Sequence, residues 1–345
     1  MPIAFESLNL DNLLIGTSAV DKVAIGVDEV WTNNPNILVA NDRSSNKYSY
    51  SGDGGISWTT AAAIPGTPIN DFLYNSGFYF VSRSGDIITI YKSSKGSDLS
   101  AVATLTVASA DTVTCIEKFG SNIWLGGVSD GVATVWRSSN AGATWTKSTP
   151  FSQNRLSSLV YGNGVLVACT MNLGPYNLAY SNNLGATWTD ISWLVNNNTL
   201  DRAYLIDSLN FTNGEFILCG HYYNSSDDSV FSILRSTNGV TWERGPNFTT
   251  SSQYQMGAKL NKGSIYEARA RDYVAYSIDF TTWTKKSAPD WTYAQVVFDG
   301  TQYIMVVSTK YCYTSPDLIT WTRKGLLGQT SYPSIVEYSV PYGTL

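Results

Sequence analysis

The sequence predicts an all-β fold built from repeated units, and three observations lead to that prediction. An eight-residue stretch, SNNLGATW at residues 181–188, recurs along the chain. Short runs of β-branched, apolar and aromatic residues, separated by Gly, Asn and Asp, fill the space between its copies. Only 14% of the 345 residues are charged, whereas the chain has 28 Gly, 22 Tyr and 11 Trp. This composition is typical of a β-rich protein with polar, uncharged loops.

Each copy of the recurring stretch, here called a box turn, begins at a Ser, has Asp or Asn two residues later and ends at a Trp. Asp or Asn bonds the backbone nearby, Gly supplies positive φ at little steric cost, and Thr-Trp restarts a strand. We therefore expect hairpin turns, each closed by a Trp that buries a large apolar area. The copies are Ser51–Trp58, Ser138–Trp145, Ser181–Trp188, Ser236–Trp242, Ser277–Trp283 and Ser315–Trp321. A worn copy without Trp lies at residues 93–99.

The spacing of the box turns predicts the architecture. If the worn copy is counted, six periods separate Trp58 from Trp321, and the mean period is about 44 residues. A period of about 40–45 residues with four strands per unit is the signature of a propeller blade. We therefore predict a seven-bladed β-propeller of four-stranded antiparallel blades.

The box turns resemble the Asp-box, or BNR, repeat, and the resemblance covers about residues 25–325. It implies a β-propeller similar to sialidase-like propellers. It does not define an activity, because sialidases, xyloglucanases, sorting receptors, assembly factors and phage tail proteins all carry the repeat.

The strands of each unit follow one order, A-turn-B-loop-C-box-D. In the fourth unit we expect strands at 158–161, 165–170, 178–181 and 187–191. Asn163-Gly164 is a strong hairpin signal between the first two of these strands. Equivalent turn signals recur in the neighbouring units, which supports one blade per unit.

Two segments compete for the first strand of blade one. Residues 334–339 follow the last box Trp at the usual spacing, whereas Glu29–Thr32 precede Trp58 at the usual spacing. We favour the C-terminal strand, because it closes the ring and protects its edges. Residues 1–26 are then an N-terminal attachment segment and 27–345 the propeller. Apolar residues in that segment need another surface, which predicts an oligomeric assembly.

Composition excludes several classes of partner and site. The net charge is −5 with no basic run, which argues against nucleic-acid binding. The four Cys lie in apolar, strand-like contexts without a CxxC motif, so we expect buried free thiols, no metal and no cofactor. The start lacks a signal-peptide pattern, and no apolar run approaches the ~18 residues of a membrane span. We expect synthesis in the cytoplasm and no membrane insertion.

Ligand contact is expected at the B–C and D–A loops, on the face opposite the box turns. Each residue there also has a simpler interpretation as loop packing. We expect no catalytic residue: His221 is the single His, and no G-x-S-x-G elbow accompanies it. The candidate ligand-binding residues are Arg43, Arg83, His221, Tyr222, Tyr223, Arg269, Arg271 and Trp291.

The functional hypothesis is based on a short N-terminal segment. Residues 20–31 (VDKVAIGVDEVW) resemble a motif of tailed-phage structural proteins. We therefore expect a non-catalytic virion protein, associated with tail or fibre, that binds host surface glycan or other virion subunits. The alternatives are a sialidase-like glycoside hydrolase and a lectin or assembly scaffold outside phages. Against the hydrolase, the chain lacks the Arg-Ile-Pro motif that the sialidase resemblance implies, and no Arg precedes Arg43.

Overall fold

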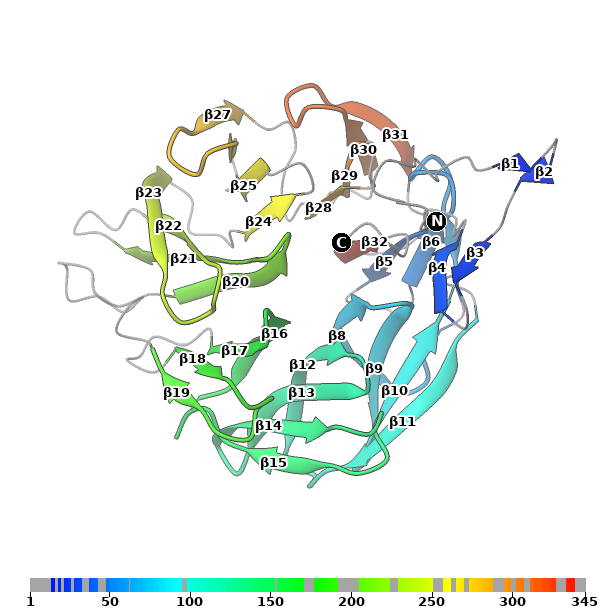
Figure 1. Ribbon diagram of the computed structural model, residues 1–345, viewed down its shortest axis with the longest axis vertical. Coiled ribbons are helices and arrows are strands. Elements are labelled where there is room, and N and C mark those ends of the chain that lie inside the picture. Colours follow the sequence, from blue (N-terminus) through cyan, green and yellow to red (C-terminus); the bar gives the residue numbers. More distant parts are fainter. Residues whose placement is uncertain are drawn as a thin grey trace.

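A computed structural model of the chain shows an all-β propeller whose four-stranded antiparallel blades stand around a common centre (Figure 1). The first strand of each blade lies nearest that centre (Figure 1). The described segments include no helix long and apolar enough to cross a membrane. The structure describes residues 14–15, 18–19, 22–25, 28–32, 37–42, 48–61, 63–94, 98–152, 154–170, 177–191, 205–223, 229–250, 257–261, 265–269, 273–287, 295–298, 302–306, 311–326 and 333–338.

Six sheets are each built from four strands that are consecutive in the chain. The first two contain β8 (Thr67–Tyr74), β9 (Phe78–Ser84), β10 (Ile87–Ser93) and β11 (Ser100–Thr106), then β12 (Thr112–Phe119), β13 (Asn122–Ser129), β14 (Val132–Ser138) and β15 (Thr146–Ser148). The next two contain β16 (Leu156–Gly162), β17 (Val165–Thr170), β18 (Leu178–Ser181) and β19 (Thr189–Asp190), then β20 (Leu205–Thr212), β21 (Glu215–Tyr223), β22 (Ser229–Ser236) and β23 (Glu243–Thr250). The last two contain β24 (Gly257–Asn261), β25 (Ile265–Arg269), β26 (Tyr273–Ser277) and β27 (Thr284–Ser287), then β28 (Gln295–Phe298), β29 (Tyr303–Val306), β30 (Tyr311–Ser315) and β31 (Thr322–Leu326).

A further four-stranded sheet, here called the composite sheet, joins the two ends of the chain in the order β32-β5-β6-β7. Its edge strand β32 is the last strand of the chain and pairs antiparallel with β5, with Val336 opposite Ala40. The strands of this sheet are β5 (Leu38–Asp42), β6 (Tyr48–Ser51), β7 (Thr59–Thr60) and β32 (Pro333–Tyr338).

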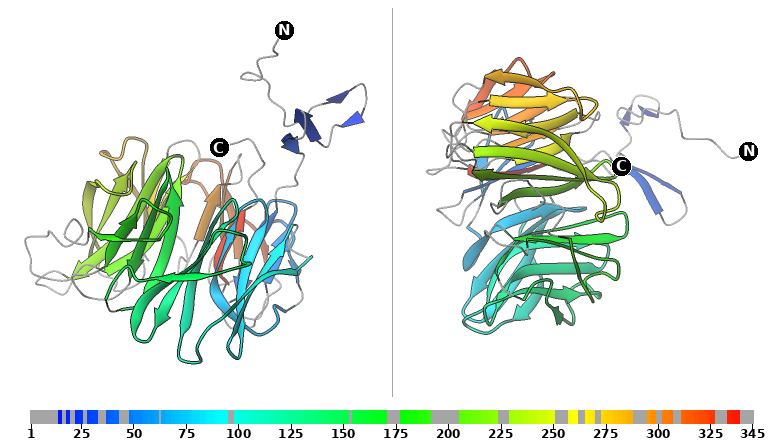
Figure 2. Two further views of the ribbon diagram at one scale, coloured as in Figure 1. Left: turned by 60° about the horizontal axis from the view of Figure 1, so that its bottom comes forward. Right: turned by 90° about the vertical axis from the view of Figure 1, so that its left-hand side faces the viewer.

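The remaining N-terminal strands form two hairpins of their own. The strands β1 (Leu14–Ile15) and β2 (Ser18–Ala19) pair with each other, as do β3 (Lys22–Ile25) and β4 (Asp28–Thr32). Both hairpins lie outside the group of blades (Figure 2). The residues 29–32, which competed for the edge of the composite sheet, therefore pair with β3, and residues 333–338 take the place beside β5.

The box turns are held by one hydrogen-bond pattern. Ser181 Oγ accepts the Gly185 N–H at 2.8 Å and donates to Asn183 Oδ1, also at 2.8 Å. Asn183 Oδ1 in turn accepts the Thr187 N–H at 2.9 Å. The box Ser side chains are buried, so the turn supplies the partners that their hydroxyls would otherwise lack.

Box turns pack against the preceding blade, and this contact explains their tight backbone. At Gly142, where φ is +91°, an added Cβ would lie 2.2 Å from the Cβ of Ala103 on β11. In two of the shorter copies, Phe280 and Leu318 take up positive φ instead, and both side chains are buried. The glycine of the other four copies is thus replaced in these two by a residue whose burial offsets its backbone strain.

The box tryptophans are less buried than the sequence led us to expect. All six are only partly buried, and Trp188 donates Nε1–H to Ser148 Oγ of the preceding blade at 3.0 Å. Among the tryptophans whose burial the structure describes, Trp124 and Trp136 are fully buried, and they lie on the central strands β13 and β14. A box Trp sits at the start of the outermost strand of its blade, where burial is less complete than on the central strands.

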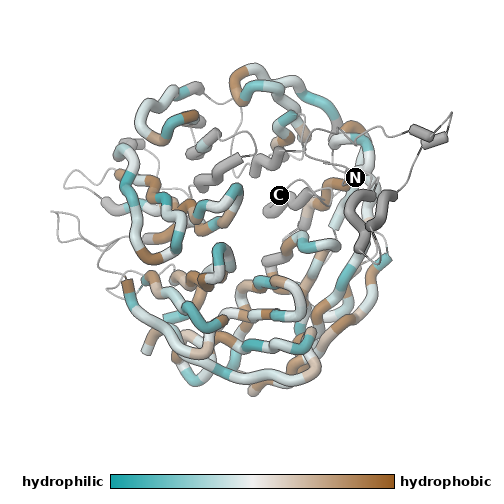
Figure 3. Tube along the Cα trace, in the orientation of Figure 1, coloured by the Kyte–Doolittle hydropathy of each residue, from teal (hydrophilic) through white to brown (hydrophobic). Residues whose placement is uncertain are grey.

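The core consists of hydrophobic layers between adjacent blades. Hydrophobic residues recur along the strands between hydrophilic stretches (Figure 3). The Trp124 indole is fully buried, stacks on Tyr161 of the next blade at 5.3 Å and donates to the Leu184 carbonyl at 2.9 Å. One side chain thus joins the central strand of one blade to the box turn of the next.

The prediction of four free, buried thiols is confirmed. Cys169 and Cys312 are the two whose pKa is most affected: burial raises the pKa of each thiol to about 12, partly opposed by nearby hydrogen bonds. Both therefore remain protonated in the folded protein at physiological pH.

The buried Trp124 should contribute more to stability than a box Trp. We expect Trp124→Ala to lower the free energy of unfolding by about 3–5 kcal/mol, because it leaves a cavity and an unpaired carbonyl. Trp188→Ala should lower the free energy of unfolding by less, since its ring is only partly buried. Guanidinium denaturation of both variants tests this, and equal losses would show that the central position of Trp124 does not matter.

The buried thiols should make stability fall at high pH. Above pH ~9 the thiols of the unfolded chain ionise, whereas Cys169 and Cys312 stay protonated when folded, so unfolding becomes easier as pH rises. Urea midpoints measured at pH 8 and pH 10 should differ more for the parent protein than for the double variant Cys169→Ala/Cys312→Ala. An identical pH dependence would contradict the assignment.

Candidate functional site

The structure distributes the predicted ligand residues over several blades. Arg83 lies at the end of β9, and His221, Tyr222 and Tyr223 end β21, three blades further round. Arg269 ends β25 on the blade adjacent to that of β21. The structure therefore brings the ends of β21 and β25 to neighbouring blades but leaves Arg83 apart. Arg43, Arg271 and Trp291 lie outside the described residues.

Arg83 is engaged by the backbone around it. Its Nε donates to the Gly85 carbonyl at 2.7 Å, and Nη2 donates to the Ala108 and Ser109 carbonyls at 3.0 and 3.2 Å. Nη1 donates to the Asp111 carbonyl. These bonds tie the β9–β10 turn to the loop that leads into the next blade. They give Arg83 a structural role, and its expected role as a ligand contact stays a prediction.

The loop that Arg83 holds is itself internally bonded. The Asp111 side chain is fully buried, and its Oδ2 accepts the Ala108 N–H at 3.2 Å. Lys147 Nζ lies 3.6 Å from the same oxygen and donates to Ser129 Oγ at 3.0 Å. This part of the B–C and D–A face is thus a bonded network that joins two blades.

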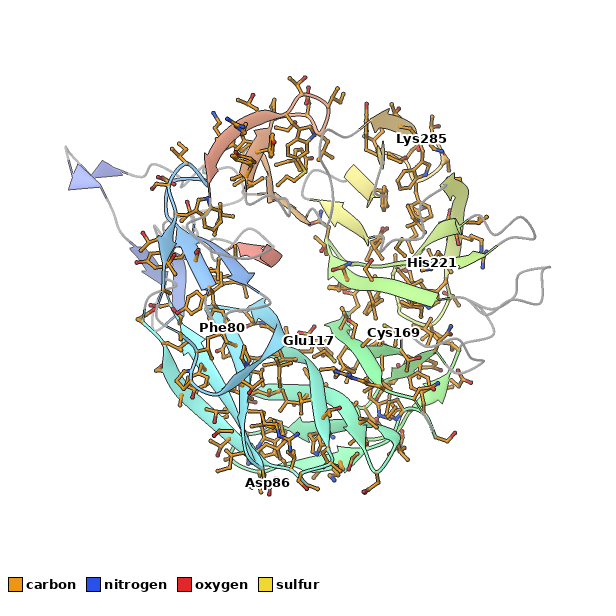
Figure 4. All side chains as sticks on the ribbon, turned by 180° about the vertical axis from the view of Figure 1, so that it is seen from behind. Phe80, Asp86, Glu117, Cys169, His221 and Lys285 are labelled. Carbon is orange, nitrogen blue, oxygen red and sulfur yellow. The ribbon has the colours of Figure 1, made fainter. Side chains whose placement is uncertain are left out.

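His221 is buried rather than presented to a ligand. It is 7% exposed and lies opposite Leu205 and Phe231 in its sheet. Figure 4 labels it within the blade of β20–β23. A ligand bound at the surface of this blade does not reach the imidazole unless the sheet rearranges.

The described residues reveal a different candidate site on the face of the box turns, which sequence reasoning missed. A hollow of about 380 Å³, here called the polar hollow, is lined by residues of the blade of β20–β23, and its Arg235 bonds Tyr266 of the next blade. It begins beside the box turn and the β20–β21 turn. Its lining residues are Glu215, Arg235, Ser236, Thr237, Thr241, Trp242 and Glu243.

A chain of polar contacts crosses the polar hollow. Arg235 Nε donates to Glu243 Oε2 at 2.8 Å, and Nη1 donates to the Tyr266 hydroxyl at 2.7 Å. The Tyr266 hydroxyl donates to Glu215 Oε2 at 2.8 Å. The Arg235 guanidinium also stacks on the Phe280 ring, 4.5 Å from its centre. Two blades and four polar side chains therefore hold one another in place.

The surroundings of the polar hollow raise the pKa of both Arg235 and Tyr266. Burial lowers the pKa of the Arg235 guanidinium, but its bonds to Glu243 and Tyr266 outweigh burial and raise the pKa above its usual value. Burial raises the pKa of the Tyr266 hydroxyl, and its bond to Glu215 raises it further. Arg235 is therefore charged and Tyr266 is a neutral donor at physiological pH.

One sequence signal could have pointed to the polar hollow. The residue after the box Trp is Thr in five copies, whereas Glu243 occupies that position in the sixth. The five threonines are Thr59, Thr146, Thr189, Thr284 and Thr322. A charged residue where the repeat otherwise keeps Thr marks a local departure from the demands of the fold.

No metal centre emerges from the part of the chain that the structure describes. Within those segments, no three His, Cys, Asp or Glu side chains come together as metal ligands. The expected absence of a metal and of a cofactor stays a prediction.

Comparison with known proteins identifies the fold and not the family. No family model matches the chain, and no curated protein matches its sequence. A chain in the crystal structure of the mitotic checkpoint complex is similar at 10% identity and a TM-score of 0.52, over 93% of this chain and 90% of that one. At this identity the likeness shows the fold alone.

Two other solved structures are similar at lower scores. A chain of the nidogen/laminin complex has 7% identity and a TM-score of 0.48, over 88% of this chain and 98% of that one. BamB from Moraxella catarrhalis has 13% identity and a TM-score of 0.45, over 84% and 83%. The chain is an all-β propeller of four-stranded antiparallel blades.

The structural role of Arg83 can be measured. Arg83→Met keeps the apolar stem but removes the donors, so we expect a loss of about 1–3 kcal/mol in the free energy of unfolding as the bonded carbonyls lose their partner. Asp86→Asn is the matched control, because its exposed carboxylate lies 3.9 Å from Arg83 and should contribute below ~1 kcal/mol. If Arg83→Met leaves the free energy of unfolding unchanged, the structural role of Arg83 is contradicted.

Proposed function

We propose that this chain is a non-catalytic structural and receptor-binding protein of a tailed-phage virion, associated with the tail or fibre. The N-terminal segment attaches it to other virion subunits, and the propeller binds host surface glycan or a further subunit. One observation carries the proposal: the hairpins β1–β2 and β3–β4 stand outside the propeller and, among the described strands, pair only within themselves.

The proposal includes a ring of seven blades in which the composite sheet is blade one. Two hydrophobic layers support it. Leu38 and Ala40 of the composite sheet pack with Ile304 and Cys312 of the last consecutive sheet. On the other side of the composite sheet, residues 37, 39 and 48 pack with Phe78 and Phe80 of β9, in the first consecutive sheet. β32 also lies between β28 and β8. A blade in contact with both neighbours closes the ring, so the propeller does not require the N-terminal strands.

The isolated hairpins favour a partner for the N-terminal segment. A two-stranded hairpin is at best marginally stable in water, and its unpaired edges are templates for another strand. A neighbouring virion subunit that adds strands to β1–β2 would satisfy both needs. We therefore propose that the chain is located in the virion, as part of an oligomeric assembly.

The phage assignment rests on the resemblance at residues 20–31. Most of this segment forms β3 and β4, which lie outside the propeller where attachment would take place. The box turns add the proposed identity of an Asp-box propeller. Their side chains serve the turn itself, since Ser181 and Asn183 bond one another and the local backbone.

A sialidase-like glycoside hydrolase is the second candidate. The polar hollow favours it in one respect, because two carboxylates line it and Tyr266 of the next blade bonds one of them. The engagement of Arg83 by carbonyls opposes it, because a sialidase needs several free Arg to clamp a carboxylate. Release of reducing sugar from a bound glycan would favour the hydrolase over the binding protein.

Deletion of residues 1–20 tests the attachment. The truncated protein should keep the melting temperature of the full chain, because the composite sheet obtains its edge strand from residues 333–338, but should lose association with virion subunits. Light scattering and incorporation into particles measure association. Unfolding of the truncated protein, or a full chain that is a monomer and absent from particles, would contradict the proposal.

A further inference from the structure

The polar hollow has the features of a ligand site on the face that the box turns occupy. We propose that it binds a neutral, hydroxyl-rich ring, one sugar unit of a glycan. The inference rests on the part of the proposed function in which the propeller is a binding module. It adds the site and the ligand chemistry, and it places the site on the opposite face from the residues predicted from the sequence.

The donors and acceptors of the polar hollow are fixed before any ligand arrives. Arg235 is held by Glu243, by the Tyr266 hydroxyl and by stacking on Phe280. These side chains therefore lose little conformational freedom on binding, which favours affinity. A site of this kind orients a ligand through a few rigid polar groups.

The chain of polar contacts leaves both hydrogen-bond donors and hydrogen-bond acceptors unused. A guanidinium has five N–H donors, and the contacts described for Arg235 use two of them. Glu215 and Glu243 each use Oε2 in the chain, so Oε1 of each carboxylate stays available as an acceptor. A sugar hydroxyl both donates and accepts, so neighbouring hydroxyls can bond a carboxylate and the guanidinium together.

The charge balance favours a neutral ligand. Two carboxylates and one guanidinium line the polar hollow. An anion that approached Arg235 would meet repulsion from Glu215 and Glu243, whereas a cation would meet Arg235, which is held between them. A neutral polyol avoids both repulsions and still uses every group.

The size and walls of the polar hollow suit a single ring. Its volume of about 380 Å³ lies at the lower end of the range for small-ligand sites. Thr237 and Thr241 are exposed at its rim, and half-buried Trp242 contributes apolar surface. Aromatic side chains with adjacent polar groups present one apolar and one hydrogen-bonding side to a ligand.

The repeat itself indicates that the box turn does not require Glu243. Five blades begin their last strand with Thr after the box Trp, and their box turns form without a carboxylate there. At the position equivalent to Arg235, Arg137 on β14 lies opposite Thr146, whereas Arg235 lies opposite Glu243. The chain thus contains a natural comparison: the same arginine position with and without the acidic partner.

Glycan-array binding of the full chain tests the inference, with neutral, sialylated, sulfated and amino-sugar glycans as probes. We expect binding to neutral glycans alone. For the strongest of them, Arg235→Lys should raise the Kd measured by calorimetry by at least about tenfold, because lysine lacks the planar fork. Tyr266→Phe, which keeps the ring and frees Arg235, should also weaken binding. Arg137→Lys is the matched control and should leave the Kd unchanged.

Several outcomes would overturn the inference. These are preferential binding of sialylated, sulfated or amino-sugar glycans, binding of proteins but of no glycan, or an Arg235→Lys variant that is folded and binds like Arg137→Lys. Melting temperatures show whether each variant is folded, and Tyr266→Phe provides a second test if Arg235→Lys is not. The protein without residues 1–20 should bind the same glycan, so failure of the attachment and failure of the polar hollow are separate results.

Discussion

The packing of each box turn against the preceding blade is the contact on which the rest of the propeller depends. A turn can lie flat on a neighbouring sheet only if no side chain intervenes and its buried polar groups are bonded. Gly142 meets the first requirement, since a Cβ there would collide with Ala103. The buried Ser hydroxyls and the Asp or Asn oxygens meet the second. Because the same contact recurs from blade to blade, each blade positions the next.

This arrangement explains why the most regular residues are poor candidates for function. Ser181 and Asn183 use their side chains to close their own turn. Arg83, chosen as a ligand contact for its charge and its place at a strand end, bonds backbone carbonyls from two loops. The site that we propose lies instead where the repeat departs from its pattern. At the polar hollow, a glutamate replaces threonine, and an arginine is stacked and bonded between two blades.

The two proposed activities use separate parts of the chain. Attachment through the N-terminal hairpins requires that the propeller be complete without them, and the pairing of β32 with β5 fits that requirement. Glycan binding at the polar hollow requires only the contact between the blades of β20–β23 and β24–β27. A virion protein with this division would keep its binding surface rigid while its N-terminal segment adapts to a neighbouring subunit.

The sequence by itself determined the repeat, the strand order and the turns, because these depend on local chemistry. Asn163-Gly164 adopts positive φ at both residues, as an Asn-Gly hairpin should. The local pattern did not reveal that the box tryptophans are only partly buried, because burial depends on whether a strand lies at the rim or in the middle of its blade. Spacing alone fits both residues 29–32 and 334–339 as the partner of β5, and we favoured the C-terminal strand only because it protects the edges of the propeller. Only the tertiary structure assigned that partner, and only it brought Arg235 and Glu243 together with Tyr266 of the next blade, because contacts between blades join residues that no spacing along the chain relates.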